Sequence, residues 1–362
     1  MAEAWNADLL RVARQLRGVQ QGEAAERLGV SQAMLSRFEN KLSAVTEDFI
    51  ERAATVYELP TSFFSQPDPV LGAPVSVHPI WRKRSTVSAR EMDQIVAELN
   101  IRVMHMRRLL QAVDIEATYS IPSMPVEDFD GDIARIAAMV RSQWQMPVGL
   151  VKDLTRTLEA AGVVVVHSPM AGSAVDGVTF SAPGLPPLVV LKSDQPADRM
   201  RFTLAHELAH LVMHRTQPTK DMEQQAHEFA SHFLLPSADV RPYFNRRIDL
   251  RLLAELKPVW RVSMASLLMK ARSLGLVAYN QERYLWQQFA SSNIRLREPP
   301  ELDFPQEAPT VLPELIEAHL QQLGYSIGDL AGMLHIGSDE LAALYGISLV
   351  PGAKAPHLRI VK

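Results

Sequence analysis

The chain has 362 residues, of which 47% are hydrophobic and 22% charged, and its 37 basic and 41 acidic side chains give a net charge of −4. These values are ordinary for a globular protein of two or three domains, and they exclude a disordered chain or a long coiled coil. With 11 histidines and no cysteine, the chain has no disulfide, iron–sulfur cluster or thiolate zinc ligand, so a tight metal site needs His, Asp or Glu.

The first residues show neither a basic nor an apolar stretch of the kind found in secretory signals. No apolar run approaches the roughly 18 residues that a transmembrane helix needs. We therefore expect a cytoplasmic protein that does not associate with membranes. Because the net charge is negative, any contact with DNA must come from a local basic surface.

Residues 1–66 predict a compact domain of short helices. One helix covers residues 21–28 and ends at Gly29, and Ser31 caps a second helix over 32–38. A helix, a short turn and a helix in this order are typical of a DNA-binding helix-turn-helix. The domain carries seven basic and nine acidic side chains, so a plain helical interaction domain is the alternative, and DNA binding would need a homodimer to double the contacts.

The second of these helices is the predicted recognition helix. Its exposed side offers amide, hydroxyl and guanidinium groups that can bond base edges or phosphates, and the start of the first helix can hold a phosphate. The predicted DNA-binding residues are Gln21, Ser31, Gln32, Ser36, Arg37, Asn40 and Lys41.

Proline and glycine are dense after residue 66, which indicates a linker or extended arm over 67–87. A long amphipathic helix over 88–113 and a second helix over 132–144 come next. Three β-branched runs at 163–167, 177–181 and 188–192 predict a small antiparallel meander. The predicted fold class is therefore mainly α with a small antiparallel β-meander, an α+β protein.

Helices are predicted from 197 to about 214 and over 222–234, 248–257 and 263–273. An acidic, proline-rich segment that begins at residue 298 indicates a second linker, and the tail is helical from 312 to 345. Residues 327–341 have a helix-turn-helix rhythm, with a packing or dimerisation element as the alternative. The predicted division is 1–66, 67–87, 88–297 and 298–362.

The most specific signal is the sequence His206-Glu207-Leu208-Ala209-His210. On a helix, residues four apart lie on one face, so both imidazoles can reach one cation while Glu207 lies beside it. Catalytic zinc usually keeps three protein ligands and one position for water, so a third ligand should follow. The alternatives are incidental histidines on a surface helix, or a metal held only for structure.

Glu223 is the predicted third ligand. It shares the apolar face of the 222–234 helix, where a buried carboxylate needs a cation. His227, one turn later, is the second choice for the third ligand. Otherwise His227, like His214, is predicted to support the ligands. The predicted ion is Zn²⁺, with Mn²⁺ as the alternative. Zinc would polarise a peptide carbonyl and acidify water, and Glu207 would accept the proton and pass it to the leaving amine.

In this order the two motifs resemble Cro/repressor-type (XRE) regulators fused to an ImmA/IrrE-type metallopeptidase. The first resemblance rests on residues 9–64, and the second on the sequence around His206 and His210 together with Glu223-Gln-Gln-Ala-His and the Pro-Ile-Trp-Arg-Lys-Arg run at 79–84. The resemblance implies zinc ligands at His206, His210 and Glu223 and an acid/base role for Glu207.

The resemblance also implies a function, because such peptidases cut a helix-turn-helix repressor and so derepress stress-response or mobile-element genes. Two hypotheses follow: an endopeptidase that cuts a repressor or its own 67–87 segment, and a regulator whose peptidase-like domain senses metal or a small ligand without cutting. The XRE family usually has Glu-x-Gly after its recognition helix. Here Glu39-Asn40-Lys41 stands there, so we expect Asn40 to take the left-handed conformation.

Overall fold

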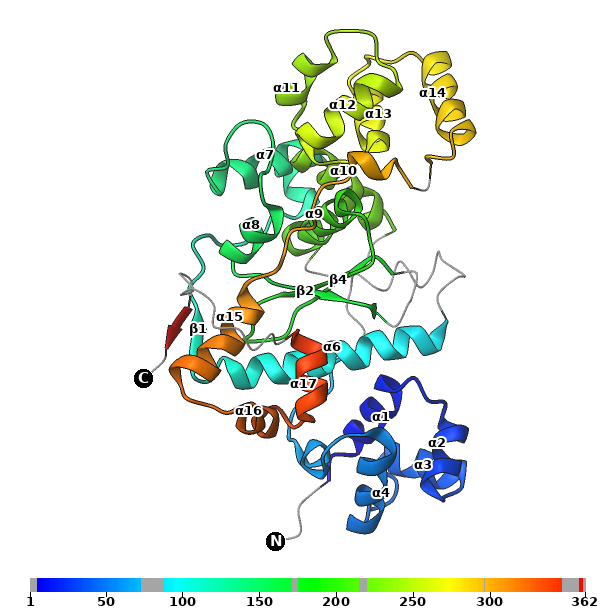
Figure 1. Ribbon diagram of the computed structural model, residues 1–362, viewed down its shortest axis with the longest axis vertical. Coiled ribbons are helices and arrows are strands. Elements are labelled where there is room, and N and C mark those ends of the chain that lie inside the picture. Colours follow the sequence, from blue (N-terminus) through cyan, green and yellow to red (C-terminus); the bar gives the residue numbers. More distant parts are fainter. Residues whose placement is uncertain are drawn as a thin grey trace.

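The structure of this protein is a computed structural model. It describes residues 5–72, 88–170, 175–214, 220–295 and 297–346, and the backbone of residues 358–360. Helices make up most of it, with a small sheet in the middle (Figure 1), which confirms the predicted α+β class. Within these residues, no helix combines the length and apolar character that crossing a bilayer requires.

The N-terminal domain is a bundle of short helices at one end of the molecule (Figure 1). They are α1 (Ala7–Leu16), α2 (Gln21–Leu28), α3 (Gln32–Glu39), α4 (Glu47–Tyr57) and the 3-10 helix η1 (Thr61–Ser65). Each contributes apolar side chains to one core, among them Leu9, Leu28, Leu35 and Phe49, which are at most 2% exposed. Full burial of one such side chain stabilises the fold by roughly 1.5–3 kcal/mol, so these positions hold the bundle together.

The unit formed by α2, the turn and α3 has the predicted helix-turn-helix geometry. Gly29 ends α2 in the left-handed conformation at φ 70°, and the Ser31 side chain caps α3. The expectation for Asn40 is wrong: its φ is −100°, and Lys41 is left-handed at φ 61°. Asn40 Nδ2 donates a 2.8 Å hydrogen bond to the Ser36 carbonyl. Asn40 therefore closes the last turn of α3, and the chain reverses one residue later.

The first part of the predicted linker is an arm that packs along the long helix α6 (Ala89–Leu109). The buried carboxylate of Asp68 accepts bonds from Arg107 Nη1 at 2.5 Å and from Arg108 Nη2 at 2.6 Å. These pairs fix the arm to the end of α6. The rest of the predicted linker, residues 73–87 with its Pro-Ile-Trp-Arg-Lys-Arg run, lies outside the described residues.

The three predicted strands form one sheet, but their pairing differs from a meander. The strands are β2 (Val164–Ser168), β3 (Gly177–Phe180) and β4 (Leu188–Lys192), in the order β2-β4-β3. β3 pairs antiparallel with β4, whereas β2 runs parallel to β4. The sheet is thus mixed. In β4, the four residues 188–191 are all buried, as expected of a central strand that is covered on both faces.

The sheet divides two hydrophobic cores. Val164 and Val166 of β2 face the core that includes α6 and the N-terminal domain, while Val165 between them faces the other core. The same alternation in β4 puts Val190 on the first side and Val189 on the second. In Figure 1, α6 accordingly lies along one face of the sheet and the helices of the second core along the other.

The second core is built mainly from helices. Those that precede the sheet are α7 (Ile133–Gln143) and α8 (Leu154–Ala160), and those that follow it are α9 (Ala197–Met213), α10 (Met222–Leu234), α11 (Ser237–Val240), α12 (Leu250–Trp260), α13 (Met264–Ser273) and α14 (Tyr279–Ser291). Short 3-10 helices η2 (Val126–Phe129) and η4 (Arg241–Phe244) connect some of them. α9 packs on β3, β4 and α8 and, with its other side, on α10.

The segment expected to be a second linker, residues 298–309, has fixed contacts with this core. Glu298 Oε2 accepts a 2.8 Å bond from Lys257 Nζ of α12, and Glu307 pairs with Arg201 of α9. All four side chains are nearly buried. Removing one partner of such a pair leaves an uncompensated buried charge, at a cost of roughly 3–5 kcal/mol. The segment, with the 3-10 turn η5 (Pro300–Leu302), is therefore a strap that brings the chain to the other face of the sheet.

After the strap come α15 (Val311–Glu317), the π-helical turn η6 (Ala318–Gln322), α16 (Ile327–Leu334) and α17 (Ser338–Tyr345). α15 packs on β2, and α16 packs on α6 (Figure 1). Tyr345 Oη lies 2.6 Å from Nδ1 of the buried His105 in α6. A short ladder of β1 (Val113–Ile115) and β5 (Leu358–Ile360) pairs the two segments antiparallel.

α16 and α17 repeat the backbone of α2 and α3. In both pairs, two eight-residue helices are separated by three residues, and the first of these is left-handed: Gly29 at φ 70° and His335 at φ 55°. The third is an extended N-cap: Ser31 at φ −73° and ψ 151°, and Gly337 at φ −71° and ψ 151°. The rhythm in the sequence thus corresponds to a second helix-turn-helix, whose first helix packs on α6.

Candidate metal centre and DNA-binding face

Two neighbouring helices, α9 and α10, supply the candidate metal site (Figure 1). His206 and His210 lie one turn apart on α9, because a helix brings residues four apart onto one face. Glu223 lies in the first turn of α10. Packing of the two helices therefore brings a carboxylate to the pair of imidazoles.

The three side chains converge. Nε2 of His206 lies 3.6 Å from Oε2 of Glu223, and Nε2 of His210 lies 3.4 Å from Oε1. The two Nε2 atoms are 3.2 Å apart. One ligand atom from each residue lies within 4.8 Å of the others, and no other three such side chains in the described part of the chain converge in this way.

The electrostatics of this cluster favour a cation between the three groups. Burial works against ionisation of Glu223, yet the two imidazoles beside it hold the pKa of this carboxyl well below its usual range. Burial opposes protonation of His206 too, but Glu223 and Glu207 raise its pKa. Oε1 of Glu223 is also buried and has no hydrogen-bond partner. A buried acceptor of this kind needs a partner, and a divalent ion bound by the three residues would provide one.

Glu207 lies on α9 next to the cluster and is 3% exposed. Its Oε2 accepts a 2.6 Å hydrogen bond from the Thr179 hydroxyl of β3. Gly177 keeps this contact close, because a Cβ there would come within 2.5 Å of Thr203 and 3.6 Å of Glu207 Cγ. Thr179 was not predicted from the sequence, because nothing in its neighbourhood reveals that β3 lies beside α9.

His214, at the end of α9, contacts a predicted ligand. Its Nδ1 lies 3.0 Å from Nδ1 of His210, and its Nε2 lies 3.0 Å from Oε1 of Gln225. Burial, together with the neighbouring His210, lowers the pKa of His214 to about 4. Gln225 was also not predicted from the sequence, because residues two apart on a helix point to different sides and only the packing of α10 on α9 brings it to His214.

The remaining histidines of the region lie outside the converging set of His206, His210 and Glu223. The His227 ring lies 5.8 Å from the His206 ring and 4.7 Å from the Phe202 ring, at the edge of the site. His232 is farther along α10, where its Nδ1 lies 3.1 Å from Nζ of the buried Lys270.

The predicted DNA-binding residues divide into two groups. Gln32 and Arg37 are exposed on α3, and neither side chain has a hydrogen bond or ion pair with another described residue. The other predicted residues have internal partners: Gln21 Nε2 donates to Glu39 at 3.1 Å, Ser31 caps α3, and Ser36 and Asn40 bond each other. Gln32 and Arg37 are thus the side chains best placed to reach DNA.

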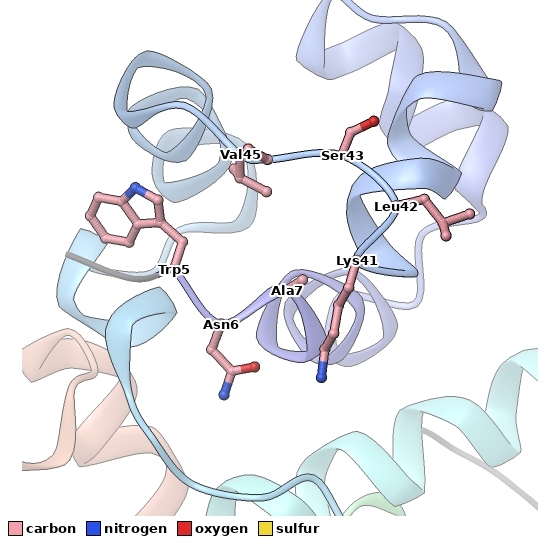
Figure 2. Close-up of a pocket in the computed structure, with 8 residues that line it drawn as sticks. Trp5, Asn6, Ala7, Lys41, Leu42, Ser43 and Val45 are labelled. Atoms are coloured by element: carbon pink, nitrogen blue, oxygen red, sulfur yellow. The ribbon is translucent and has the colours of Figure 1, made fainter. Parts of the chain in front are cut away.

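Lys41 belongs to the second group. Its Nζ lies 2.6 Å from Oδ2 of Asp8. Figure 2 shows its side chain turned towards the start of α1, at the edge of a pocket of about 500 Å³ between α1 and the loop that follows α3, while Leu42 points away. Because Lys41 is 61% exposed, its charge still contributes to the potential of this face.

Two family models match parts of the chain. A helix-turn-helix family model matches residues 10–64, and a model of the IrrE N-terminal-like domain, a metallopeptidase-like family, matches residues 158–272. The second match covers α9 and α10 with the candidate cluster. A search of curated proteins finds no match. The chain therefore joins an XRE-type helix-turn-helix domain to an ImmA/IrrE-like peptidase domain.

Proposed function

We propose that the protein is a DNA-binding transcriptional regulator whose second domain is a zinc-dependent endopeptidase that cuts a helix-turn-helix repressor, in trans or in its own chain. The observation that carries this proposal is the convergence of His206, His210 and Glu223 beside Glu207. The same chain carries a DNA-binding domain with an exposed recognition helix. As such a regulator it would act in the cytoplasm.

The donor set fits zinc. Two imidazoles and one carboxylate are the ligands of many catalytic zinc sites, in which a fourth position stays open. Oε1 of Glu223 is buried and has no hydrogen bond, although it lies 3.4 Å from Nε2 of His210, which supports a cation at this position. When bound, zinc supplies Lewis-acid chemistry that acidifies water and polarises a peptide carbonyl.

Glu207 would handle the proton. Thr179 occupies one of its carboxylate oxygens, Oε2, and so fixes the orientation of the group, which leaves Oε1 to accept a proton from the attacking water. As the C–O bond forms and the C–N bond breaks, Glu207 would deliver that proton to the leaving nitrogen. The products are a carboxylic acid and an amine.

One observation favours the alternative, a sensor that does not cut. Glu207 is 3% exposed and already bonded to Thr179. In that case the cluster would bind metal or a small ligand and change DNA binding without hydrolysis.

A cleavage assay distinguishes the two functions. The zinc-loaded full chain is incubated alone and with purified helix-turn-helix repressors, and fragments are identified by mass spectrometry. We expect fragments with the wild type and with Glu228→Gln, an exposed carboxylate on α10, and none with Glu207→Gln. Equal fragments from Glu207→Gln and wild type, or no fragments at all, would contradict the peptidase proposal. If metal then still changed DNA binding, the sensor would be favoured.

A further inference from the structure

Two hydrogen bonds in series connect the candidate ligand His210 to Gln225 through His214. The first joins Nδ1 of His210 to Nδ1 of His214, and the second joins Nε2 of His214 to Oε1 of Gln225, each at 3.0 Å. His214 can take this place because it follows the last turn of α9, with φ −117° and ψ 56°. Its ring lies 5.0 Å from the His210 ring.

Only two proton arrangements satisfy both bonds when the imidazoles are neutral. A neutral imidazole has one donor nitrogen and one acceptor nitrogen. If Gln225 accepts through its carbonyl oxygen, Nε2 of His214 is the donor, its Nδ1 accepts from Nδ1 of His210, and Nε2 of His210 keeps a lone pair. If the Gln225 amide were reversed and donated, every proton would shift, and Nε2 of His210 would carry hydrogen.

We propose that Gln225 and His214 are positioning residues that fix the tautomer of His210, so that its Nε2 presents a lone pair towards Glu223 and His206. The inference rests on the proposed metal site, because only a metal ligand needs that lone pair. A bond to the nitrogen that does not bind metal commonly sets the tautomer and orientation of a ligating histidine.

The position of Gln225 links the orientation of His210 to the helix that carries Glu223. It lies two residues after Glu223 on α10, so one helix supplies both a ligand and the oxygen that orients a ligand on the facing helix. Displacement of α10 against α9 would disturb both at once. The neighbouring Gln224 is exposed, which provides a control at the adjacent position with the same side chain.

Zinc affinity of the full chain is the first test, measured by competition with a chromophoric chelator. Loss of a partner that orients a zinc ligand typically weakens binding by roughly 10–100-fold. We expect that loss for Gln225→Ala and wild-type affinity for Gln224→Ala. Gln225→Glu should retain affinity, because a carboxylate at this position can only accept. Equal affinity for Gln225→Ala and Gln224→Ala would overturn the inference.

Nitrogen-15 NMR of histidine-labelled, zinc-free protein is the second test, and it does not depend on activity. In the wild type and in Gln225→Glu we expect the proton of His210 on Nδ1, and in Gln225→Ala a mixture of tautomers. A proton on Nε2 of His210 in the wild type would refute the inference. Failure of the wild type to bind zinc would instead refute the metal site, so the two failures are distinguishable.

Discussion

Arg17 of the DNA-binding domain and Glu340 of α17 face each other across 323 residues of sequence. Nη1 and Nη2 of the arginine lie 3.0 and 3.3 Å from the two carboxylate oxygens. The same guanidinium donates to the carbonyls of Tyr57 and Glu58 at the end of α4. The C-terminal helix-turn-helix is therefore bound directly to the N-terminal domain.

A double-mutant cycle should measure this link. Each side chain of the pair is 26% exposed, so we expect a coupling energy of about 0.5–1 kcal/mol between Arg17→Ala and Glu340→Ala in urea unfolding. Arg17→Ala alone should cost about 2 kcal/mol, because it also removes the bonds to the two carbonyls. The control is Asp339→Ala, which removes the adjacent exposed acid. A coupling energy near zero would show that the pair contributes nothing to docking.

Local patterns in the sequence predict the helices and the strand positions well. The cap at Ser31 and the left-handed Gly29 lie where their residue types indicate, since both depend only on neighbours in sequence. The pairing of the strands, in contrast, cannot be predicted from local patterns. Which strands become neighbours depends on how the sheet packs against helices distant in sequence, and the local runs carry no information about that packing.

The strap is a similar case. Its prolines and acids are typical of a solvated linker, but Glu298 and Glu307 are buried because Lys257 and Arg201 meet them. No local pattern reveals such partners. In the candidate site, the helical repeat was enough to predict that His206 and His210 share one face of a helix. The choice of Glu223 needed the apolar face of its own helix and the resemblance to a known family. Thr179 and Gln225 act through neighbouring elements and could be recognised only after these elements were placed.

Zinc should stabilise the folded chain. A ligand that binds only the folded state adds about 2.7 kcal/mol when its free concentration is about 100 times Kd. We expect zinc to raise the Tm of the wild type and of His227→Ala, a chelator to reverse the rise, and His206→Ala to abolish it. Thermal unfolding by circular dichroism with and without zinc measures this. If His227→Ala abolished the rise and Glu223→Ala did not, His227 would be the third ligand.

DNA binding should depend on Arg37. We expect Arg37→Ala to weaken binding to DNA from the protein's own promoter and to reduce the slope of log K against log salt by about 1, because one phosphate or base contact is lost. Fluorescence anisotropy over a salt series gives both values. Arg27→Ala removes the same charge from α2, where Arg27 pairs with Glu23, and should change little. Equal effects of the two variants would indicate a non-specific charge effect.

The buried Lys270 should make stability depend on pH. Burial lowers its pKa from 10.5 to about 8. Between pH 8 and 10.5 the unfolded chain therefore binds more protons than the folded one, and the free energy of unfolding should rise with pH across that window. Below pH 8 the full cost of burying the charge, about 3 kcal/mol, is present. Lys270→Met should be more stable than the wild type at pH 7 by up to that amount, because His232 is 22% exposed and can bond water instead. Lys270→Met should also lose the rise of the free energy of unfolding with pH.

Urea unfolding at pH 7, 8, 9 and 10 measures both effects of the Lys270 substitution. The exposed Lys220→Met is the control and should keep the pH profile of the wild type. A wild type whose stability falls steadily from pH 8 to 10, in parallel with Lys270→Met, would show that the buried amine stays charged in the folded protein.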